Sequence, residues 1–112
     1  MNKDFIQFQS EFLKYQKLFG LNGYKVYFKY EPLDDAFASI NVDQSNMVAT
    51  VRLNHKIPDK EKPHRDIKQS AKHEALHLLL GRLEENARYR YSTPNEIYEA
   101  TEELVHKLED LI

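Results

Sequence analysis

The sequence predicts a small α+β domain, a single unit over residues 1–112, in which one helix, a three-stranded sheet and two further helices follow one another. Three observations predict this fold class. Apolar residues recur every three or four positions near both ends of the chain, the period of a helix with one buried face. Between residues 24 and 54 they alternate with polar residues, the period of a half-buried strand. A chain of 112 residues has no room for a second core of useful size.

Composition narrows the range of partners. Hydrophobic residues make up 41% of the chain, which is enough for a packed core. Sixteen basic and eighteen acidic side chains give a net charge of -2, so we expect neither nucleic acid nor a membrane as a partner. There is no cysteine, so a metal would need nitrogen and oxygen ligands. Without an apolar signal core or membrane-length run, we expect a cytoplasmic protein, and we expect a monomer.

Residues 3–19 are predicted to form the first helix. Its apolar face is made by Phe5, Phe8, Phe12, Tyr15 and Phe19. Gly20 fits a C-terminal cap, and Asn22 with Gly23 fits a turn.

Three strands are predicted next, over residues 24–31, 38–42 and 47–54. Pro32 ends the first strand, and the turn-forming residues 43–46 separate the second from the third. Short strands joined by turns favour an antiparallel sheet.

Residues 57–63 are polar, contain two prolines and suit a loop. A second helix is predicted from residue 64 to about residue 85. Its segment 75–80 is apolar nearly all round, so we expect it to be buried between two layers.

A loop is predicted over residues 87–93, where Ser92 or Thr93 can cap a final helix that begins at Pro94. Glu96 lies near the third position of that helix, as in a capping box. The residues that we expect this helix to bury are Ile97, Thr101, Leu104, Val105, Leu108, Leu111 and Ile112.

The sequence His73-Glu74-Ala75-Leu76-His77 is an HExxH motif within the second predicted helix. Residues four apart lie one above the other on a helix, so both imidazoles can reach one zinc ion. Glu74 lies about 100° round the helix and can instead reach a metal-bound water. Zinc lowers the pKa of such a water, and a carboxylate can take its proton and pass it to a leaving amine. We therefore predict zinc ligands at His73 and His77 and a general base at Glu74.

The plain alternative is two surface histidines that fall at this spacing by coincidence. Their apolar surroundings argue against it, because buried imidazoles without a function would each need a hydrogen-bond partner.

A catalytic zinc site takes three protein ligands. Leu83 stands where the extended motif HExxHxxGxxH has its last histidine, and Gly81 comes one place too late for its glycine, so that form is disfavoured. The third ligand is then a carboxylate or one of His55, His64 and His106.

The last predicted helix carries five carboxylates, Glu96, Glu99, Glu102, Glu103 and Glu109. Glu102 flanks the apolar face and is the preferred third ligand, whereas Glu99 and Glu103 point more nearly outward and remain alternatives. Glu84 and Glu85 follow the motif closely and are expected to point past the metal.

Hydrolysis also needs a group that stabilises the developing oxyanion. The candidates are Tyr89, Tyr91 and Tyr98, with Arg88 and Arg90 in the same stretch. Ser70 lies one turn before Glu74 and could support the ligands, although a solvated serine is the simpler interpretation.

These residues, with a short sheet before the motif helix and a glutamate-bearing helix after it, resemble the gluzincin zinc metallopeptidases. The likeness is greatest to their minimal single-domain forms, the minigluzincins, and to related phage-type zincins. The resemblance implies a zincin-like fold, ligands at His73, His77 and Glu102, and a base at Glu74, with peptides or proteins as substrates. It also implies that residues 47–54 form the edge strand over the cleft, where an extended peptide could add.

Two other functions fit the sequence. The first is a zinc-binding regulatory or partner-binding module without turnover, because so short a chain has little surface for substrate pockets. The second is a helical adaptor without a metal.

Overall fold

The computed structural model describes residues 2–56, 66–88 and 93–112. Helix α1 (Lys3–Leu18) is followed by strands β1 (Lys25–Glu31), β2 (Ala38–Asp43) and β3 (Val48–Asn54), and then by helices α2 (Ile67–Arg88) and α3 (Pro94–Leu111). This order confirms the α+β class and the predicted succession of elements. The loop predicted over residues 57–63 and the proposed start of the second helix at residue 64 lie outside the described residues.

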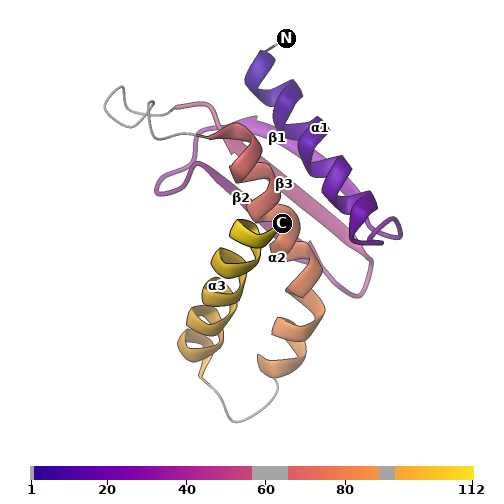
Figure 1. The fold of residues 1–112 in the computed structure, drawn as a ribbon, viewed down its shortest axis with the longest axis vertical. Coiled ribbons are helices and arrows are strands. Elements are labelled where there is room, and N and C mark those ends of the chain that lie inside the picture. The colour runs from indigo at the N-terminus through magenta and orange to yellow at the C-terminus, as the bar shows by residue number, and fades with distance from the viewer. Residues whose placement is uncertain (1, 57–65, 89–92) are drawn as a thin grey trace.

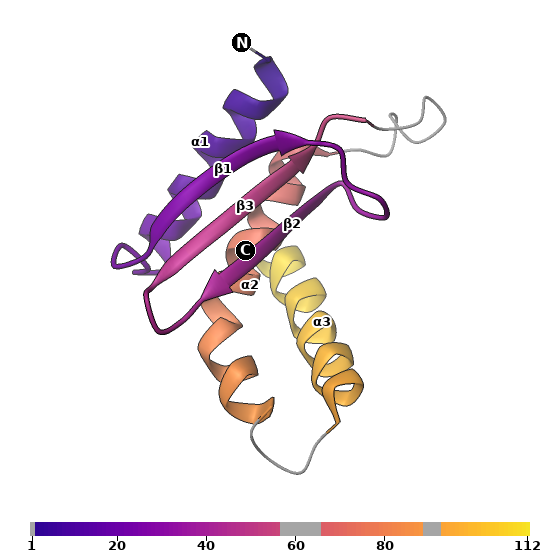
Figure 2. The ribbon, with the colours of Figure 1, turned by 180° about the vertical axis from the view of Figure 1, so that it is seen from behind.

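The sheet is mixed, and its strand order is β1-β3-β2 (Figure 2). Strand β2 runs antiparallel to β3, as a hairpin requires, but β1 runs parallel to β3. Two predictions are therefore wrong: the sheet is not all antiparallel, and residues 47–54 do not form an edge strand, because β3 lies in the centre. Strand β2 forms an edge instead.

The connection from β1 to β2 explains this topology. The Asn54 side chain at the end of β3 is only 4% exposed. Its oxygen accepts hydrogen bonds from the backbone N–H groups of Leu33 and Lys56, at 3.1 and 2.9 Å. Its amide nitrogen donates to the carbonyls of Leu33 and Ala36, both at 2.9 Å. The connection is thus tied across the end of β3, and β2 returns along the other side of that strand.

The core lies between the sheet and helices α1 and α2, which cover one face of the sheet (Figure 1). Phe8 and Phe12 of α1 are fully buried, and each meets the Phe28 ring of β1 edge-on, at centroid distances of 6.4 and 5.5 Å. Helix α2 adds Ala71, Ala75 and Leu78 to the same core. One face of α2 is thereby fixed against the core, and its opposite face is free to carry polar groups.

Helix α1 ends as its sequence predicts. Gly20 has a φ of 71°, in the left-handed region that favours glycine. The N–H groups of Gly20 and Leu21 donate to the carbonyls of Lys17 and Gln16, at 3.1 and 2.9 Å. These bonds form a Schellman cap that satisfies the last carbonyls of the helix.

Helix α2 ends later than predicted and includes residues 87 and 88, which were expected in a loop. An ion pair between Arg88 Nη2 and Glu84 Oε1, at 2.7 Å, supports this additional turn.

Helix α3 begins with the predicted capping box, in which Thr93 and Glu96 satisfy each other's backbone N–H groups. It packs against α2 and extends away from α1 (Figure 1). Burial of Leu104, Leu111 and Ile112 was predicted, but all three are exposed. With α2 as its main neighbour, α3 buries a narrow stripe, made of Ile97, Thr101, Val105 and Glu109. None of the described helices combines the length and apolarity of a membrane crossing.

Candidate metal centre

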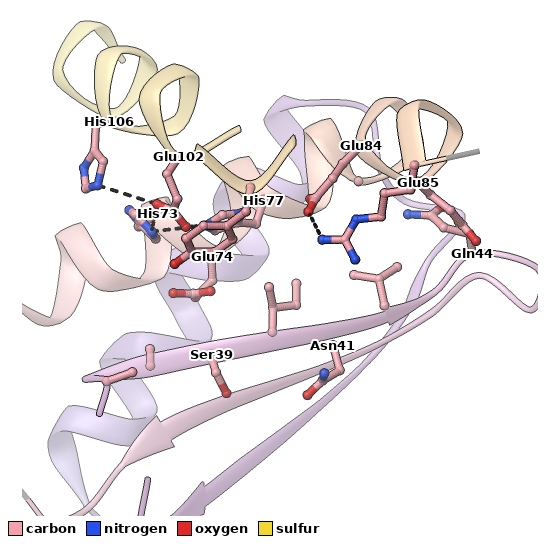
Figure 3. Close-up of a pocket in the computed structure, with 17 residues that line it drawn as sticks. Ser39, Asn41, Gln44, His73, Glu74, His77, Glu84, Glu85, Glu102 and His106 are labelled. Atoms are coloured by element: carbon pink, nitrogen blue, oxygen red, sulfur yellow. Dashed lines mark hydrogen bonds and ion pairs between the residues drawn. The ribbon is translucent and has the colours of Figure 1, made fainter. Parts of the chain in front are cut away.

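The HExxH motif lies in the middle of α2, and its histidine and glutamate side chains point toward α3 and β2 (Figure 3). Ala75 and Leu78 bury the opposite face in the core, which sets the rotation of the helix. The same rotation directs His73 and His77 toward α3, one turn apart, with their ring centroids 4.9 Å from each other.

Three predicted ligands come together at this point. His73 Nε2 lies 3.2 Å from His77 Nε2. Glu102 of α3 faces both rings: its Oε1 is 2.9 Å from His77 Nε2 and its Oε2 is 3.6 Å from His73 Nε2. Ligands bound tetrahedrally to zinc at about 2.0–2.1 Å are separated from one another by about 3.3–3.4 Å. The separations in the structure lie around this value, so the donor set fits a zinc ion in both chemistry and spacing.

Of the alternative ligands, His106 alone among the described residues reaches this point, with its Nε2 3.5 Å from Glu102 Oε2. It forms a second possible metal-binding group with His73 and Glu109. The other described candidates do not reach it. Glu99 is exposed, and Glu103 is 65% exposed and pairs with Lys107 at 2.8 Å. His55 packs edge-on against Tyr30, with 5.4 Å between the centroids. His64 lies outside the described residues.

Glu109 and His106 of α3 complete the cluster, and the role of Glu109 was not predicted from the sequence. The Glu109 side chain is 10% exposed and bridges two imidazoles, with Oε2 2.9 Å from His73 Nδ1 and Oε1 2.8 Å from His106 Nδ1. Burial alone would raise the pKa of this carboxyl, but the hydrogen bonds from His106 and His73 hold it below its usual range. As a carboxylate, Glu109 accepts from Nδ1–H of His73 and leaves Nε2 of that ring as a lone pair toward Glu102.

A spacing in the sequence could have indicated these residues. His106 and Glu109 follow Glu102 by four and seven positions, so all three share one face of a helix.

Glu74 lies beside the ligand cluster and is 6% exposed. Burial, followed by the charges of Glu102 and Glu109, raises the pKa of its carboxyl to about 8. Burial also lowers the pKa of His77, which favours the neutral ring that a metal requires. A divalent cation at the cluster would offset the neighbouring negative charges and bring the pKa of Glu74 down again.

A cleft of about 740 Å³ between β2, α2 and α3 is lined by His73, Glu74, His77, Glu102 and His106. Residues 38–42 of β2 form one wall, and Ser39 and Asn41 point away from His73 and Glu74 (Figure 3). Beyond His77 the cleft continues along α2 past Gly81 to Glu84 and Glu85, which thus lie past the ligand cluster as predicted.

The candidates for oxyanion stabilisation and for support of the ligands lie in different places. Tyr98 is exposed and lines the cleft, whereas Tyr89, Arg90 and Tyr91 lie outside the described residues. Arg88 is held by Glu84. Ser70 lines a smaller adjoining cavity of about 350 Å³ together with His73, Glu74 and Glu109.

Comparison of the chain with protein-family models, with curated proteins and with solved structures gives no match. The resemblance to the gluzincins therefore rests on the order of the elements and on His73, Glu74, His77 and Glu102.

Proposed function

We propose that this protein is a zinc-dependent peptide hydrolase with a zincin-like fold, in which His73, His77 and Glu102 hold the ion and Glu74 is the general base. One observation carries the proposal: two imidazole nitrogens and a carboxylate converge within 4.8 Å of one another, beside a buried carboxylate, on the wall of an open cleft.

The donor set supports zinc. Two imidazoles and one carboxylate, without cysteine, form a ligand set of catalytic zinc sites, in which three protein ligands leave a fourth position for water or substrate. When bound, zinc would polarise a carbonyl and lower the pKa of a water in that position.

The roles of the protein groups follow from their positions. Glu74 is the residue beside the cluster that can take a proton from the attacking water and return it to the leaving amine. Glu109 fixes the tautomer of His73, because its carboxylate accepts only from a protonated Nδ1. Tyr98 lines the cleft and is a candidate to stabilise the oxyanion.

A peptide substrate is supported by the position of β2. Among the described strands β2 pairs with β3 alone, and its residues 38–42 line the cleft. An extended peptide could add to β2 by main-chain hydrogen bonds, which places its carbonyls near the metal centre. The resemblance implied that an extended peptide pairs with residues 47–54. In this proposal the peptide pairs with β2 instead.

A Glu74→Gln variant tests the proposal. Protein purified without a histidine tag should contain about one equivalent of zinc in both forms. The wild type should cleave members of a degenerate peptide library, as detected by mass spectrometry. The variant should lose at least about a hundredfold of this activity, because the amide cannot accept the proton. Glu103→Gln, an exposed change on α3, serves as the matched control and should retain full activity.

Each result that differs from these expectations would contradict one part of the proposal. Protein without zinc would exclude the metal centre, and a variant as active as the wild type would exclude Glu74 as the base. Zinc-loaded wild type that cleaves no peptide would favour a zinc-binding module without turnover.

A further inference from the structure

Gly81 lies in the interior of α2, where glycine is a poor helix former, and it lines the cleft. The structure provides a reason for a glycine here. A Cβ atom built on Gly81 would lie 2.6 Å from Nε2 of Gln44, closer than such atoms approach in real proteins. The Gln44 amide therefore occupies the space that any other side chain at position 81 would need.

The Gln44 amide is also held from its other end. Gln44 lies in the turn between β2 and β3, and its Oε1 accepts a hydrogen bond from the Tyr24 hydroxyl at 2.5 Å. With its oxygen turned to Tyr24, the amide presents its NH2 group over Gly81. Among the described residues no acceptor pairs with that nitrogen. Figure 3 shows Gln44 at the end of the cleft remote from His73.

We propose that Gln44 is a substrate-positioning residue, whose NH2 group donates a hydrogen bond to a main-chain carbonyl of an extended peptide in the cleft. This inference rests on the proposed peptide hydrolase. Gly81 follows His77 by four residues, a rise of about 6 Å along the helix. An extended peptide advances about 3.3 Å per residue, so the carbonyl belongs to a residue about two positions from the scissile bond.

The charges at this end of the cleft disfavour the C-terminal carboxylate of a peptide. Glu84 and Glu85 line the cleft beside Gly81, and Arg88 pairs with Glu84. A terminal carboxylate here would face Glu85, whereas a neutral carbonyl can accept from Gln44 without that repulsion. The inferred substrate is therefore a peptide whose C-terminal carboxylate does not lie at this end of the cleft.

The kinetic test uses peptides around one cleaved bond, shortened stepwise from either end. Gln44→Ala should raise KM about threefold to tenfold, the loss of one neutral hydrogen bond, and leave kcat unchanged. The increase in KM should occur only with peptides that include the residue two positions from the scissile bond, on one side of that bond. Tyr24→Phe should raise KM in the same peptides by a smaller factor, because the amide loses its anchor. Gln7→Ala, an exposed change on α1, is the matched control.

Gly81→Ala separates displacement of the amide from damage to the fold. Alanine favours the helix, so the variant should fold at least as stably as the wild type while its methyl group displaces Gln44. The KM of Gly81→Ala should rise by the same factor as that of Gln44→Ala. A protein that carries both substitutions should have the KM of Gln44→Ala alone, because it has no amide left to displace.

A second readout does not depend on turnover. In zinc-loaded Glu74→Gln protein labelled with ¹⁵N, the side-chain amide signals of Gln44, assigned by their loss in Gln44→Ala, should shift when the long peptide is added. The short peptide should leave them in place. If the wild type cleaves the peptides but Gln44→Ala has an unchanged KM, the inference is wrong and the hydrolase stands. If peptides shift these signals but the wild type does not cleave them, the hydrolase is wrong and Gln44 is still the contact. If no peptide is bound or cleaved, both are wrong.

Discussion

Replacing Glu109 by glutamine should weaken zinc binding while leaving all three proposed ligands in place. Glu109 is not one of these three ligands, and it contacts Nδ1 of the ligand His73 at 2.9 Å and Nδ1 of His106 at 2.8 Å. Glutamine has nearly the same size, so the change alters hydrogen bonding and charge without opening a cavity. It is thus a specific test of whether α3 positions the metal ligands on α2.

The magnitude follows from what glutamine can accept. The carboxylate accepts from two imidazole N–H groups at once, whereas an amide has one acceptor oxygen and an NH2 group that repels a second donor. One of the two rings must therefore lose its partner or take the other tautomer, in which its Nδ1 accepts from the amide. Loss of such a partner typically lowers metal affinity about 10- to 100-fold, or about 1.4–2.7 kcal/mol. Hydrogen bonds to charged groups are worth about 1.5–3 kcal/mol, which agrees.

The assay is a competition between the protein and a chelator of known zinc affinity at constant pH. Glu103→Gln removes one charge from the same helix at an exposed site and should keep the wild-type Kd, which controls for the general effect of charge. A Glu109→Gln protein whose Kd stays within about twofold of the wild type would refute the positioning role.

Three further predictions concern the fold and its titration. Asn54→Ala removes four partly buried hydrogen bonds and should cost about 2–4 kcal/mol of unfolding free energy in urea; a loss below about 1 kcal/mol would contradict the proposed anchoring of the β1–β2 connection. Gly20→Ala places a side chain at φ 71° with no atom within 4 Å of its Cβ, so backbone strain alone should cost about 1–2 kcal/mol, and an unchanged urea midpoint would contradict this. In metal-free protein, burial, followed by the charges of Glu102 and Glu109, raises the pKa of Glu74 from 4.5 to about 8. The folded state therefore keeps a proton that the unfolded state releases, and the unfolding free energy should fall as pH rises through this window; Glu74→Gln should flatten the profile, and an equal slope in both proteins would contradict the assignment.

Features encoded within a few residues could be predicted from the sequence. The caps at Gly20 and Thr93 depend on local backbone geometry, and both are confirmed. The spacing of His73 and His77 also depends only on the pitch of a helix, and their nitrogens converge as expected. Such features need no knowledge of how the elements pack.

The pairing of the strands could not be predicted in this way. Turn residues identify the β2–β3 hairpin, but nothing local in residues 25–31 indicates whether that strand joins β2 or β3. The choice depends on Asn54, which binds a loop about twenty positions earlier in the chain. A long-range contact of a single polar side chain leaves no periodic signal, so the parallel pairing of β1 with β3 was missed.

Burial on α3 shows the same limit. The helical wheel separates Glu102 from Glu99 and Glu103 correctly, because the rotation of a helix about its axis follows from its own apolar residues. The extent of the covered face depends on how many neighbours the helix has. With α2 as its main neighbour, α3 leaves Leu104 and Leu111 exposed.

The burial of Glu74 bears on the choice between a hydrolase and a zinc module without turnover. A site that only binds zinc needs its ligands and the groups that orient them, and Glu74 is neither. The Glu74 carboxyl is only 6% exposed and lies near the charges of Glu102 and Glu109. Both conditions disfavour its ionised form and raise its pKa. An apolar residue of similar size would remove that cost without touching a ligand. A group that destabilises the fold and faces an open cleft is expected where it takes part in chemistry, so the position of Glu74 favours the hydrolase.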